Sequence, residues 1–234
     1  MSFRYTPAVR DAFPTLVTAV LHVPALPIPF AAEKAISTLL ADARESLSRR
    51  AESEAPPIQA WRRAFSQMGL KPTKYRCASE ALLRRLRKEG ELPSVHPLVD
   101  LCNAVSARYA VPIAVFDLAQ VDGSLTVGAA QGTEVFETFS GVVEHPDPGE
   151  IIFVDEAHRA HARRWTNRQG ARSAITQGTR SALIVSEGLH DAAEADCIAL
   201  QSLLQSTLER HGAAVTTSLL RAGIGAVSWA RDVE

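Results

Sequence analysis

The hydrophobic periodicity of the chain changes at Pro112, and this change constrains the fold more than any other feature of the sequence. Before Pro112, apolar residues recur every three or four positions, which is typical of amphipathic helices. After it, apolar and polar residues alternate, which is typical of strands with one buried face. A block of helices followed by a block of strands favours an α+β domain with mostly antiparallel strands over a doubly wound parallel sheet.

The expected elements follow from this periodicity. Helices are predicted over residues 32–51, 58–68, 79–89, 98–109 and 191–211, and strands over residues 113–118, 124–130, 134–139, 151–154, 180–186 and 215–220. The run Val121-Asp122-Gly123 predicts a tight turn that joins the first two of these strands. An apolar stretch from Leu16 to Phe30 predicts a further strand near the N-terminus, with a stiff exit at Pro24, Pro27 and Pro29.

Composition limits the class of protein. With 234 residues, 46% of them hydrophobic, the chain can bury a sizeable core, and we expect a single domain over 1–234. No apolar run reaches the roughly 20 residues that cross a bilayer, and no signal peptide is evident, so we expect a cytoplasmic protein without a membrane partner. Three cysteines without a Cys-x-x-Cys pair argue against disulfides and zinc, and no metal or other cofactor is expected. The sequence carries no signal of an oligomeric state.

Arginine is concentrated in one segment. Residues 157–180 contain six arginines and no carboxylate, although the formal net charge is -1. The same segment holds Trp165, Asn167 and Gln169, which can stack on a base or hydrogen-bond to it. A second basic cluster spans Lys71 to Lys88, whereas acids concentrate in residues 134–156 and 187–209. This segregation predicts a face that binds the phosphates of a nucleic acid, and the alternative is a solvated face whose charges only maintain solubility.

Five motifs stand out along the chain: Trp61-Arg62-Arg63-Ala64-Phe65, Lys74-Tyr75-Arg76, Val99-Asp100-Leu101-Cys102-Asn103, Pro112-Ile113-Ala114-Val115-Phe116-Asp117 and Arg163-Arg164-Trp165. Together they resemble the editing domain of the phenylalanyl-tRNA synthetase beta subunit and its free-standing relatives. The resemblance runs from about residue 58 to residue 186, which leaves residues 1–55 as an N-terminal extension with a strand and a helix.

The resemblance implies a layered β-sandwich of mostly antiparallel strands packed against helices. It also implies a tRNA partner and hydrolysis of the ester that joins a wrong amino acid to the tRNA acceptor end. A histidine of the synthetase pocket falls on Ala114 here, and a glutamate that reads the tyrosine hydroxyl falls near Ala171. We therefore expect an apolar pocket that prefers a hydrophobic amino acid over tyrosine.

The expected site has two parts, and no catalytic residue is assigned. The expected substrate-binding residues are Asn103, Ala114, Asn167, Gln169, Ala171 and Thr179. The expected RNA-binding residues are Arg76, Arg84, Arg85, Arg87, Arg163, Arg164 and Arg168. Asn103 could equally serve to fix its neighbouring loop through backbone hydrogen bonds.

Two functions remain open at this point. The first is a deacylase that positions water at the ester without a metal or a covalent intermediate. The second is a non-catalytic module that binds tRNA or another ligand. Polar groups that replace the missing histidine and glutamate would favour the deacylase, and Asn167 and Gln169 are the candidates.

Other reactive residues have simpler explanations. Cys102 is expected in the core rather than as a nucleophile paired with His96. His158 and His161 are expected as exposed polar residues rather than metal ligands. Ser173 and its neighbours Thr176 and Thr179 have no acid or base partner nearby in the sequence, so they are expected as strand or turn hydroxyls. Trp61 and Phe65 are expected as core residues.

Overall fold

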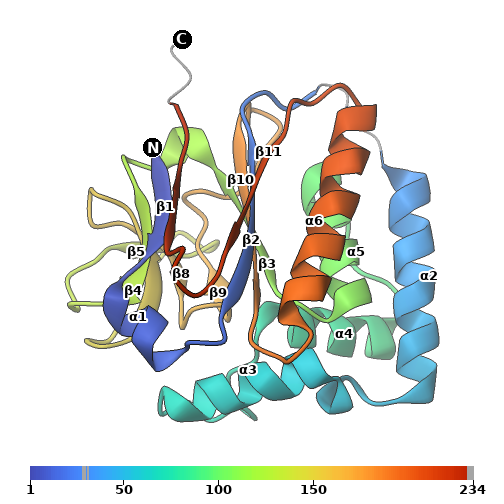
Figure 1. The fold of residues 1–234 in the computed structure, drawn as a ribbon, viewed down its shortest axis with the longest axis horizontal. Helices are drawn as coiled ribbons and strands as arrows, with labels where there is room; N and C mark the ends of the chain where they lie inside the picture. Colours follow the sequence, from blue (N-terminus) through green and yellow to red (C-terminus); the bar gives the residue numbers. More distant parts are fainter. Residues whose placement is uncertain (28–29, 31, 231–234) are drawn as a thin grey trace.

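Two β-sheets and a layer of helices form the molecule (Figure 1). The computed structural model describes residues 1–27, 30 and 32–230, so Pro29 lies outside the described residues. In Figure 1 the larger sheet lies at the left, the smaller sheet in the centre, and α2, α5 and α6 at the right. This arrangement confirms the predicted α+β fold.

The five predicted helices are present close to their predicted bounds, and a short helix at Pro7–Ala12 was not predicted. Pro56 begins α3 at a position where its missing N–H costs no hydrogen bond, and Gly90 ends α4 with a left-handed φ of 79°. The α-helices are α1 (Pro7–Ala12), α2 (Glu33–Arg49), α3 (Pro56–Gln67), α4 (Ala78–Glu89), α5 (Pro97–Tyr109) and α6 (Ala193–Arg210), and the 3-10 turns are η1 (Glu52–Glu54) and η2 (Leu118–Gln120). Within the described part of the chain, none of these helices has the length and apolarity that crossing a bilayer would require.

The strands form two main sheets and one short ribbon. The six-stranded sheet has the order β12 (Ala226–Ser228), β1 (Ser2–Tyr5), β4 (Leu125–Ala129), β7 (Ile151–Val154), β8 (Ala160–Arg163) and β9 (Arg168–Gln169). The four-stranded sheet has the order β11 (Thr216–Leu220), β2 (Val17–Val23), β10 (Ala182–Gly188) and β3 (Ile113–Asp117). The ribbon pairs β5 (Phe136–Glu137) with β6 (Val143–Glu144). Neighbouring strands run antiparallel except β1 and β4, which are parallel.

The tight turn predicted at Val121-Asp122-Gly123 is present, but the two strands that it joins do not pair with each other. The strand before it, β3, belongs to the four-stranded sheet, and the strand after it, β4, belongs to the six-stranded sheet. Gly123 does adopt a left-handed φ of 64°, as a tight turn requires. The turn therefore carries the chain from one sheet to the other instead of pairing its two flanking strands.

Both faces of the four-stranded sheet are buried. In β10, Leu183 and Val185 pack into a core between the two sheets, whereas Ala182 and Ile184 pack against the helical layer. Trp61 and Phe65 of α3 are 0% and 1% exposed in the first of these cores, as predicted. The strand predicted near the N-terminus is β2. It pairs with β10 on one side and β11 on the other, so it lies in the interior of the four-stranded sheet rather than in an extension outside it.

Candidate functional site

A small cavity of about 50 Å³ lies where β3, β9 and the end of β10 meet the start of α4. Three of the expected substrate-binding residues, Ala114, Asn167 and Gln169, line it together. The other lining residues are Ala78, Pro112, Ile113, Phe153, Ala162, Trp165, Thr166, Arg168 and Glu187. Ala114 therefore meets Asn167 and Gln169, which follow it by 53 and 55 positions in the sequence, at one site.

The turn between β8 and β9 shapes one wall of this cavity. Arg164 and Trp165 both have positive φ values, 47° and 55°, which are strained for residues other than glycine. The strained turn is held by hydrogen bonds from Arg164 N to Glu150 Oε1 (2.9 Å) and from Trp165 N to the Ile151 carbonyl (2.6 Å). It directs the Trp165 side chain into the core, where it is 0% exposed. Trp165 is therefore not available for base stacking, contrary to expectation.

Glu187 is the group in this cavity that sequence reasoning missed. It lies at the end of β10 and is 2% exposed. Its Oε1 accepts hydrogen bonds from the Tyr5 hydroxyl (2.5 Å) and from Trp165 Nε1 (2.7 Å). Its Oε2 accepts none among the described residues. The cavity is thus not the apolar pocket that was expected, because a carboxyl group lines it.

Burial controls the protonation of this carboxyl group. Removal from water raises the pKa of Glu187 to about 7, and the hydrogen bonds from Tyr5 and Trp165 oppose this rise only in part. Burial and the adjacent Glu187 also raise the pKa of Tyr5 well above 10, so the phenol remains a hydrogen-bond donor. The carboxyl group therefore changes between its acid and base forms near neutral pH.

The amide groups of Asn167 and Gln169 fix the walls of the cavity. Asn167 Nδ2 donates to the Arg76 carbonyl (2.7 Å), and Gln169 Nε2 donates to the Val115 carbonyl (2.7 Å). Thr166 Oγ1 also lines the cavity and is buried without a hydrogen-bond partner among the described residues. The Thr166 hydroxyl is therefore a polar group of the cavity lining without a partner in the described structure, and Glu187 is a lining residue whose two side-chain hydrogen bonds both fall on Oε1.

The structure separates the remaining expected pocket residues from this cavity. Asn103 is half-buried on α5 and lines another cavity together with residues of α2. Thr179 is 3% exposed and donates its hydroxyl to Asp117 Oδ2 at 2.7 Å. Ala171 does not line the cavity, and its N–H donates to the Glu137 carbonyl. The expected grouping of these three with Ala114 is therefore wrong.

Three arginines of the run, Arg163, Arg168 and Arg172, form ion pairs with acids from other segments. Arg163 is 5% exposed and makes a bidentate pair with Glu150, at 2.9 and 2.7 Å, and a further bond to Glu144. Arg168 also pairs with Glu144, at 3.0 Å. The expectation that Arg163 binds RNA is corrected, because its guanidinium is buried and its hydrogen bonds are used inside the protein.

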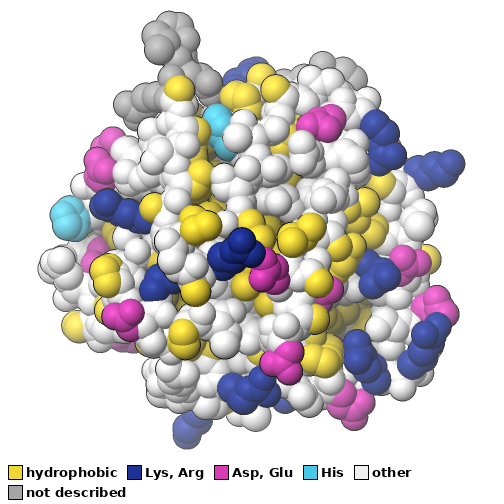
Figure 2. Space-filling view, viewed as in Figure 1, with side chains coloured by type: hydrophobic (Ala, Val, Ile, Leu, Met, Phe, Trp, Pro, Cys, Tyr) yellow, Lys and Arg dark blue, Asp and Glu magenta, His cyan; other side chains and the backbone are white. Residues whose placement is uncertain are grey.

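The four arginines expected to bind RNA around α4 are paired as well. Arg76 pairs with the buried Glu80, and Arg85 pairs with Glu89 along the helix. Arg84 and Arg87 both pair with Glu52, which is 5% exposed. Figure 2 shows basic and acidic side chains intermingled on the face that it displays. Segregation of charge along the chain therefore does not produce a uniformly basic face in this view.

A smaller group of cations does bring the two basic clusters together. The guanidinium carbon of Arg164 lies 4.7 Å from the ring centroid of Tyr75, and Lys74 Nζ lies 5.1 Å from the same centroid. Lys71 and Lys74 are exposed, and neither they nor Arg164 forms an ion pair within the described part of the chain. We call Lys71, Lys74, Tyr75 and Arg164 the basic edge. It adjoins the cavity because Arg164 directly precedes the lining residue Trp165, and because Tyr75 directly precedes Arg76, whose carbonyl accepts a hydrogen bond from the lining residue Asn167.

Two other reactive groups lie in the interior. Cys102 is 1% exposed, as expected for a core cysteine, and burial strongly raises its pKa. His161 is 0% exposed rather than exposed, with Nδ1 at 2.8 Å from Ser173 Oγ and Nε2 at 3.2 Å from Asp155 Oδ2. Ser173 thus has the partner that the sequence did not reveal. Because both side chains are inaccessible, we interpret this chain of polar groups as structural.

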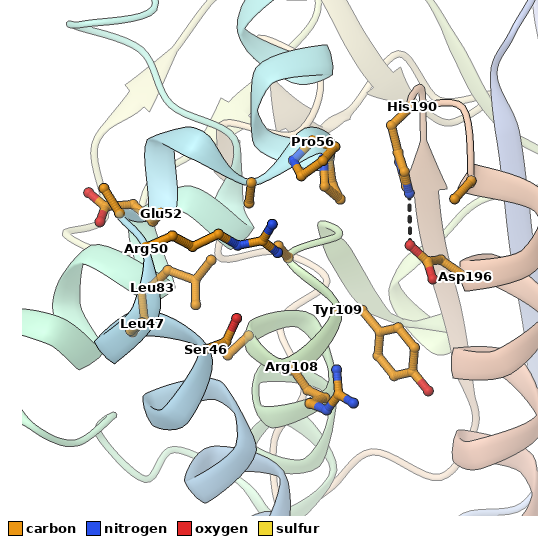
Figure 3. Close-up of a pocket in the computed structure, with 16 residues that line it drawn as sticks. Ser46, Leu47, Arg50, Glu52, Pro56, Leu83, Arg108, Tyr109, His190 and Asp196 are labelled. Carbon is orange, nitrogen blue, oxygen red and sulfur yellow. Dashed lines mark hydrogen bonds and ion pairs between the residues drawn. The ribbon is translucent and has the colours of Figure 1, made fainter.

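A larger cavity of about 400 Å³ lies near the ends of α2 and α5 (Figure 3). Arg50 extends across the middle of the view, and His190 is bonded to Asp196 at 2.8 Å. None of the expected site residues lines this cavity. Among the described residues, no cluster of three or more His, Cys, Asp or Glu side chains suits a metal ion. The smaller cavity is therefore the candidate site.

Comparisons with known proteins define the family. Residues 60–220, more than half of the chain, match the model of the B3/4 domain, and the chain therefore belongs to the B3/4 domain family. This is a domain related to the phenylalanyl-tRNA synthetase beta subunit, which confirms the resemblance found in the sequence. The match extends beyond residue 186 to include α6 and β11.

Two relatives illustrate the relationship. The phenylalanine–tRNA ligase beta subunit of Fusobacterium nucleatum is 31% identical over 87 residues, which cover 37% of this chain and 11% of that one. An N-terminal fragment of the phenylalanyl-tRNA synthetase beta subunit from Pyrococcus horikoshii has a similar fold, with a TM-score of 0.50 and 10% identity. That alignment covers 91% of this chain and 49% of the fragment. The chain thus spans about a tenth of the length of the curated relative and about half of the solved fragment.

Proposed function

We propose that this protein binds the aminoacylated 3′ end of a tRNA and hydrolyses its ester. The observation that carries the proposal is the position of the cavity lined by Ala114, Asn167 and Gln169 directly beside the basic edge. Relatives of the chain are subunits of a tRNA ligase. A nucleic acid that meets the basic edge would present its terminal group to this cavity.

The basic edge has the chemistry that a single-stranded RNA end needs. Lysine and arginine neutralise phosphates, and guanidinium planes and aromatic rings stack on bases. Arg164 over the ring of Tyr75 combines both properties. Arg168 lies at the cavity and could contribute after exchanging Glu144 for a phosphate, since it is 41% exposed. Arg76, Arg84, Arg85 and Arg87 would need to give up an acidic partner in the same way.

Hydrolysis rather than binding alone is supported by the polar groups in the cavity. Ala114 supplies no acid or base, but Glu187 and the Thr166 hydroxyl do line the space. Deacylation by positioned water requires preorganised polar groups of this kind and neither a metal nor a covalent intermediate. The competing proposal is a module that binds the acceptor end without hydrolysis.

Binding can be tested by filter retention of tRNA at several salt concentrations. Replacing both Lys74 and Arg164 with alanine should weaken binding and lower the slope of log affinity against log salt by about one to two, because roughly 0.7 is lost per single-stranded phosphate contact. The matched control is Arg85→Ala with Lys88→Ala, two exposed cations on α4. A large loss in the control with none in the basic-edge variant would move the RNA site to α4.

A further inference from the structure

We propose that Glu187 is the general base of this site and takes a proton from the water that attacks the aminoacyl ester. The proposal rests on the deacylase function proposed above and adds a catalytic residue to it. The geometry of the carboxyl group and of the cavity carries the argument.

The two oxygens of Glu187 have different surroundings. Oε1 is held by Tyr5 and Trp165, so the orientation of the carboxyl group is fixed. Both donors are themselves anchored, because Tyr5 also bonds Thr18 at 2.7 Å and Trp165 is fully buried. Oε2 has no hydrogen-bond partner among the described residues and belongs to a residue that lines the cavity. It is therefore the oxygen available to a water molecule.

The cavity has the size and polarity of a water site. A water molecule occupies about 30 Å³ in the liquid and needs two or more polar partners. The cavity measures about 50 Å³, the buried Thr166 Oγ1 lacks a partner within the described structure, and both side-chain hydrogen bonds of Glu187 fall on Oε1, which leaves Oε2 for the water. By comparison, an apolar cavity that holds benzene measures roughly 150 Å³. The space thus suits the attacking water, with the acyl group at its mouth.

The acid–base properties of the carboxyl group suit the same role. A general base works best when its pKa is near the working pH. Burial brings the pKa of Glu187 to about 7, so a substantial fraction is ionised at neutral pH. The carboxyl group of Glu150 differs: despite burial, the bidentate Arg163 keeps its pKa below the usual value, which leaves Glu150 a weaker base.

The reaction balances with water alone. The water oxygen bonds to the ester carbonyl carbon while one water proton passes to Glu187 Oε2. The tetrahedral intermediate then collapses, the bond from carbon to the ribose oxygen breaks, and Glu187 returns its proton to that oxygen. The products are the free amino acid, which ionises, and a tRNA with a free ribose hydroxyl. Glu187 ends as a carboxylate, so no other reactant is needed.

The test compares the wild-type protein with Glu187→Gln. Glutamine can retain an oxygen for Tyr5 and Trp165 but cannot accept a proton, so folding and tRNA binding should persist. The substrates are tRNAs charged with radiolabelled alanine, valine, phenylalanine or tyrosine, and the best one is used for a pH series. We expect Glu187→Gln to slow hydrolysis by about 10²-fold or more and to remove an inflection near pH 7 from the rate profile.

Two further variants complete the experiment. Glu134→Gln removes another buried glutamate, 3% exposed and bonded to backbone N–H groups outside the cavity, and should leave the rate unchanged. Thr166→Val removes the second proposed contact to the water without altering a carboxyl group, and should slow hydrolysis by about tenfold.

Each outcome decides between the two proposals. If the wild-type protein hydrolyses none of the esters, the deacylase function fails and the role of Glu187 fails with it. If the wild-type protein is active and Glu187→Gln has the same rate and pH profile, only the role of Glu187 is overturned. Should Glu187→Gln not fold, an unchanged rate in Thr166→Val would overturn the water site instead.

Discussion

The indole Nε1 of Trp165 donates a hydrogen bond of 2.7 Å to the carboxyl group of Glu187. These two side chains come from different sheets, since Trp165 follows β8 and Glu187 lies in β10. The bond thus joins the two layers of the sandwich directly beneath the candidate site. It also links the strained turn that presents Arg164 to the buried group that we propose as the base.

The first prediction concerns the pH dependence of stability. The folded pKa of Glu187, about 7, lies above the ordinary value of 4.5. Below about pH 4.5 the group is protonated in both states, and as pH rises toward 7 the unfolded state ionises first, so stability falls. The shift lowers the free energy of unfolding of the wild type by about 3 kcal/mol. A variant with glutamine at this position would not lose this stability.

Urea unfolding of the wild type and Glu187→Gln from pH 5 to pH 8 measures this effect. The unfolding free energy of the variant should rise relative to the wild type across this range, most of it before pH 7. Other carboxyl groups cancel in the difference because both proteins contain them. A difference that does not change with pH would show that Glu187 ionises normally in the folded state.

The second prediction separates two adjacent arginines. Arg163→Ala leaves Glu150 buried without its bidentate partner, and breaking such a pair costs about 3 to 5 kcal/mol. Arg164→Ala removes a half-exposed side chain that forms no ion pair, so its cost should be below about 1 kcal/mol. Denaturant unfolding measures both. Equal losses of unfolding free energy in the two variants would contradict the structure, in which Arg163 is buried and paired whereas Arg164 is half-exposed.

The third prediction concerns the polar chain in the interior. Ser173 and His161 are 2.8 Å apart and could be mistaken for a catalytic pair. Because Ser173 is fully buried, Ser173→Ala should leave ester hydrolysis within about twofold of the wild type, and a fluorophosphonate should not label the protein. Loss of hydrolysis in a variant that still folds and binds tRNA would refute the structural interpretation.

The fourth prediction concerns the amino acid. The cavity of about 50 Å³ is far smaller than the roughly 150 Å³ that holds benzene, so the side chain of the amino acid must stay at its mouth and a phenol gains no enclosed pocket. Hydrolysis of tyrosyl-tRNA should therefore be no faster than hydrolysis of alanyl-tRNA. Initial rates on the two esters, corrected for spontaneous hydrolysis, provide the comparison. A tenfold preference for the tyrosyl ester would contradict this account of the cavity.

Local pattern predicted the helices well because each has one apolar stripe that must be buried. The helix predicted at 58–68 and the strand predicted at 113–118 match α3 and β3 within two residues. The strand β8 was missed because its residues, Ala160 to Arg163, are all buried although two are polar. His161 is buried beside Asp155 and Ser173, and Arg163 is buried beside Glu144 and Glu150. Because these partners come from other segments, the strand itself shows no alternation of polar and apolar residues.

The site was predictable only in part for the same reason. The motifs located Ala114, and the aromatic and amide residues of the arginine segment pointed to Asn167 and Gln169. Nothing local indicates that Glu187, in a strand end of ordinary composition, is buried beside them. Likewise, the run of arginines looked unpaired because its acidic partners precede it in the chain. Glu137 pairs with Arg172, Glu144 pairs with both Arg163 and Arg168, and Glu150 pairs with Arg163.

The central claim is that this cavity and its basic edge act on an aminoacyl ester of tRNA. Its most direct test is the release of labelled amino acid from charged tRNAs under single-turnover conditions, with purified wild-type protein in excess. The account predicts hydrolysis well above the spontaneous rate for at least one ester, and strong loss of that rate in the Lys74→Ala, Arg164→Ala double variant at low protein concentration. If the protein binds tRNA but every charged tRNA is hydrolysed only at its spontaneous rate, the claim is contradicted, and the protein is then a module that binds tRNA without hydrolysing it.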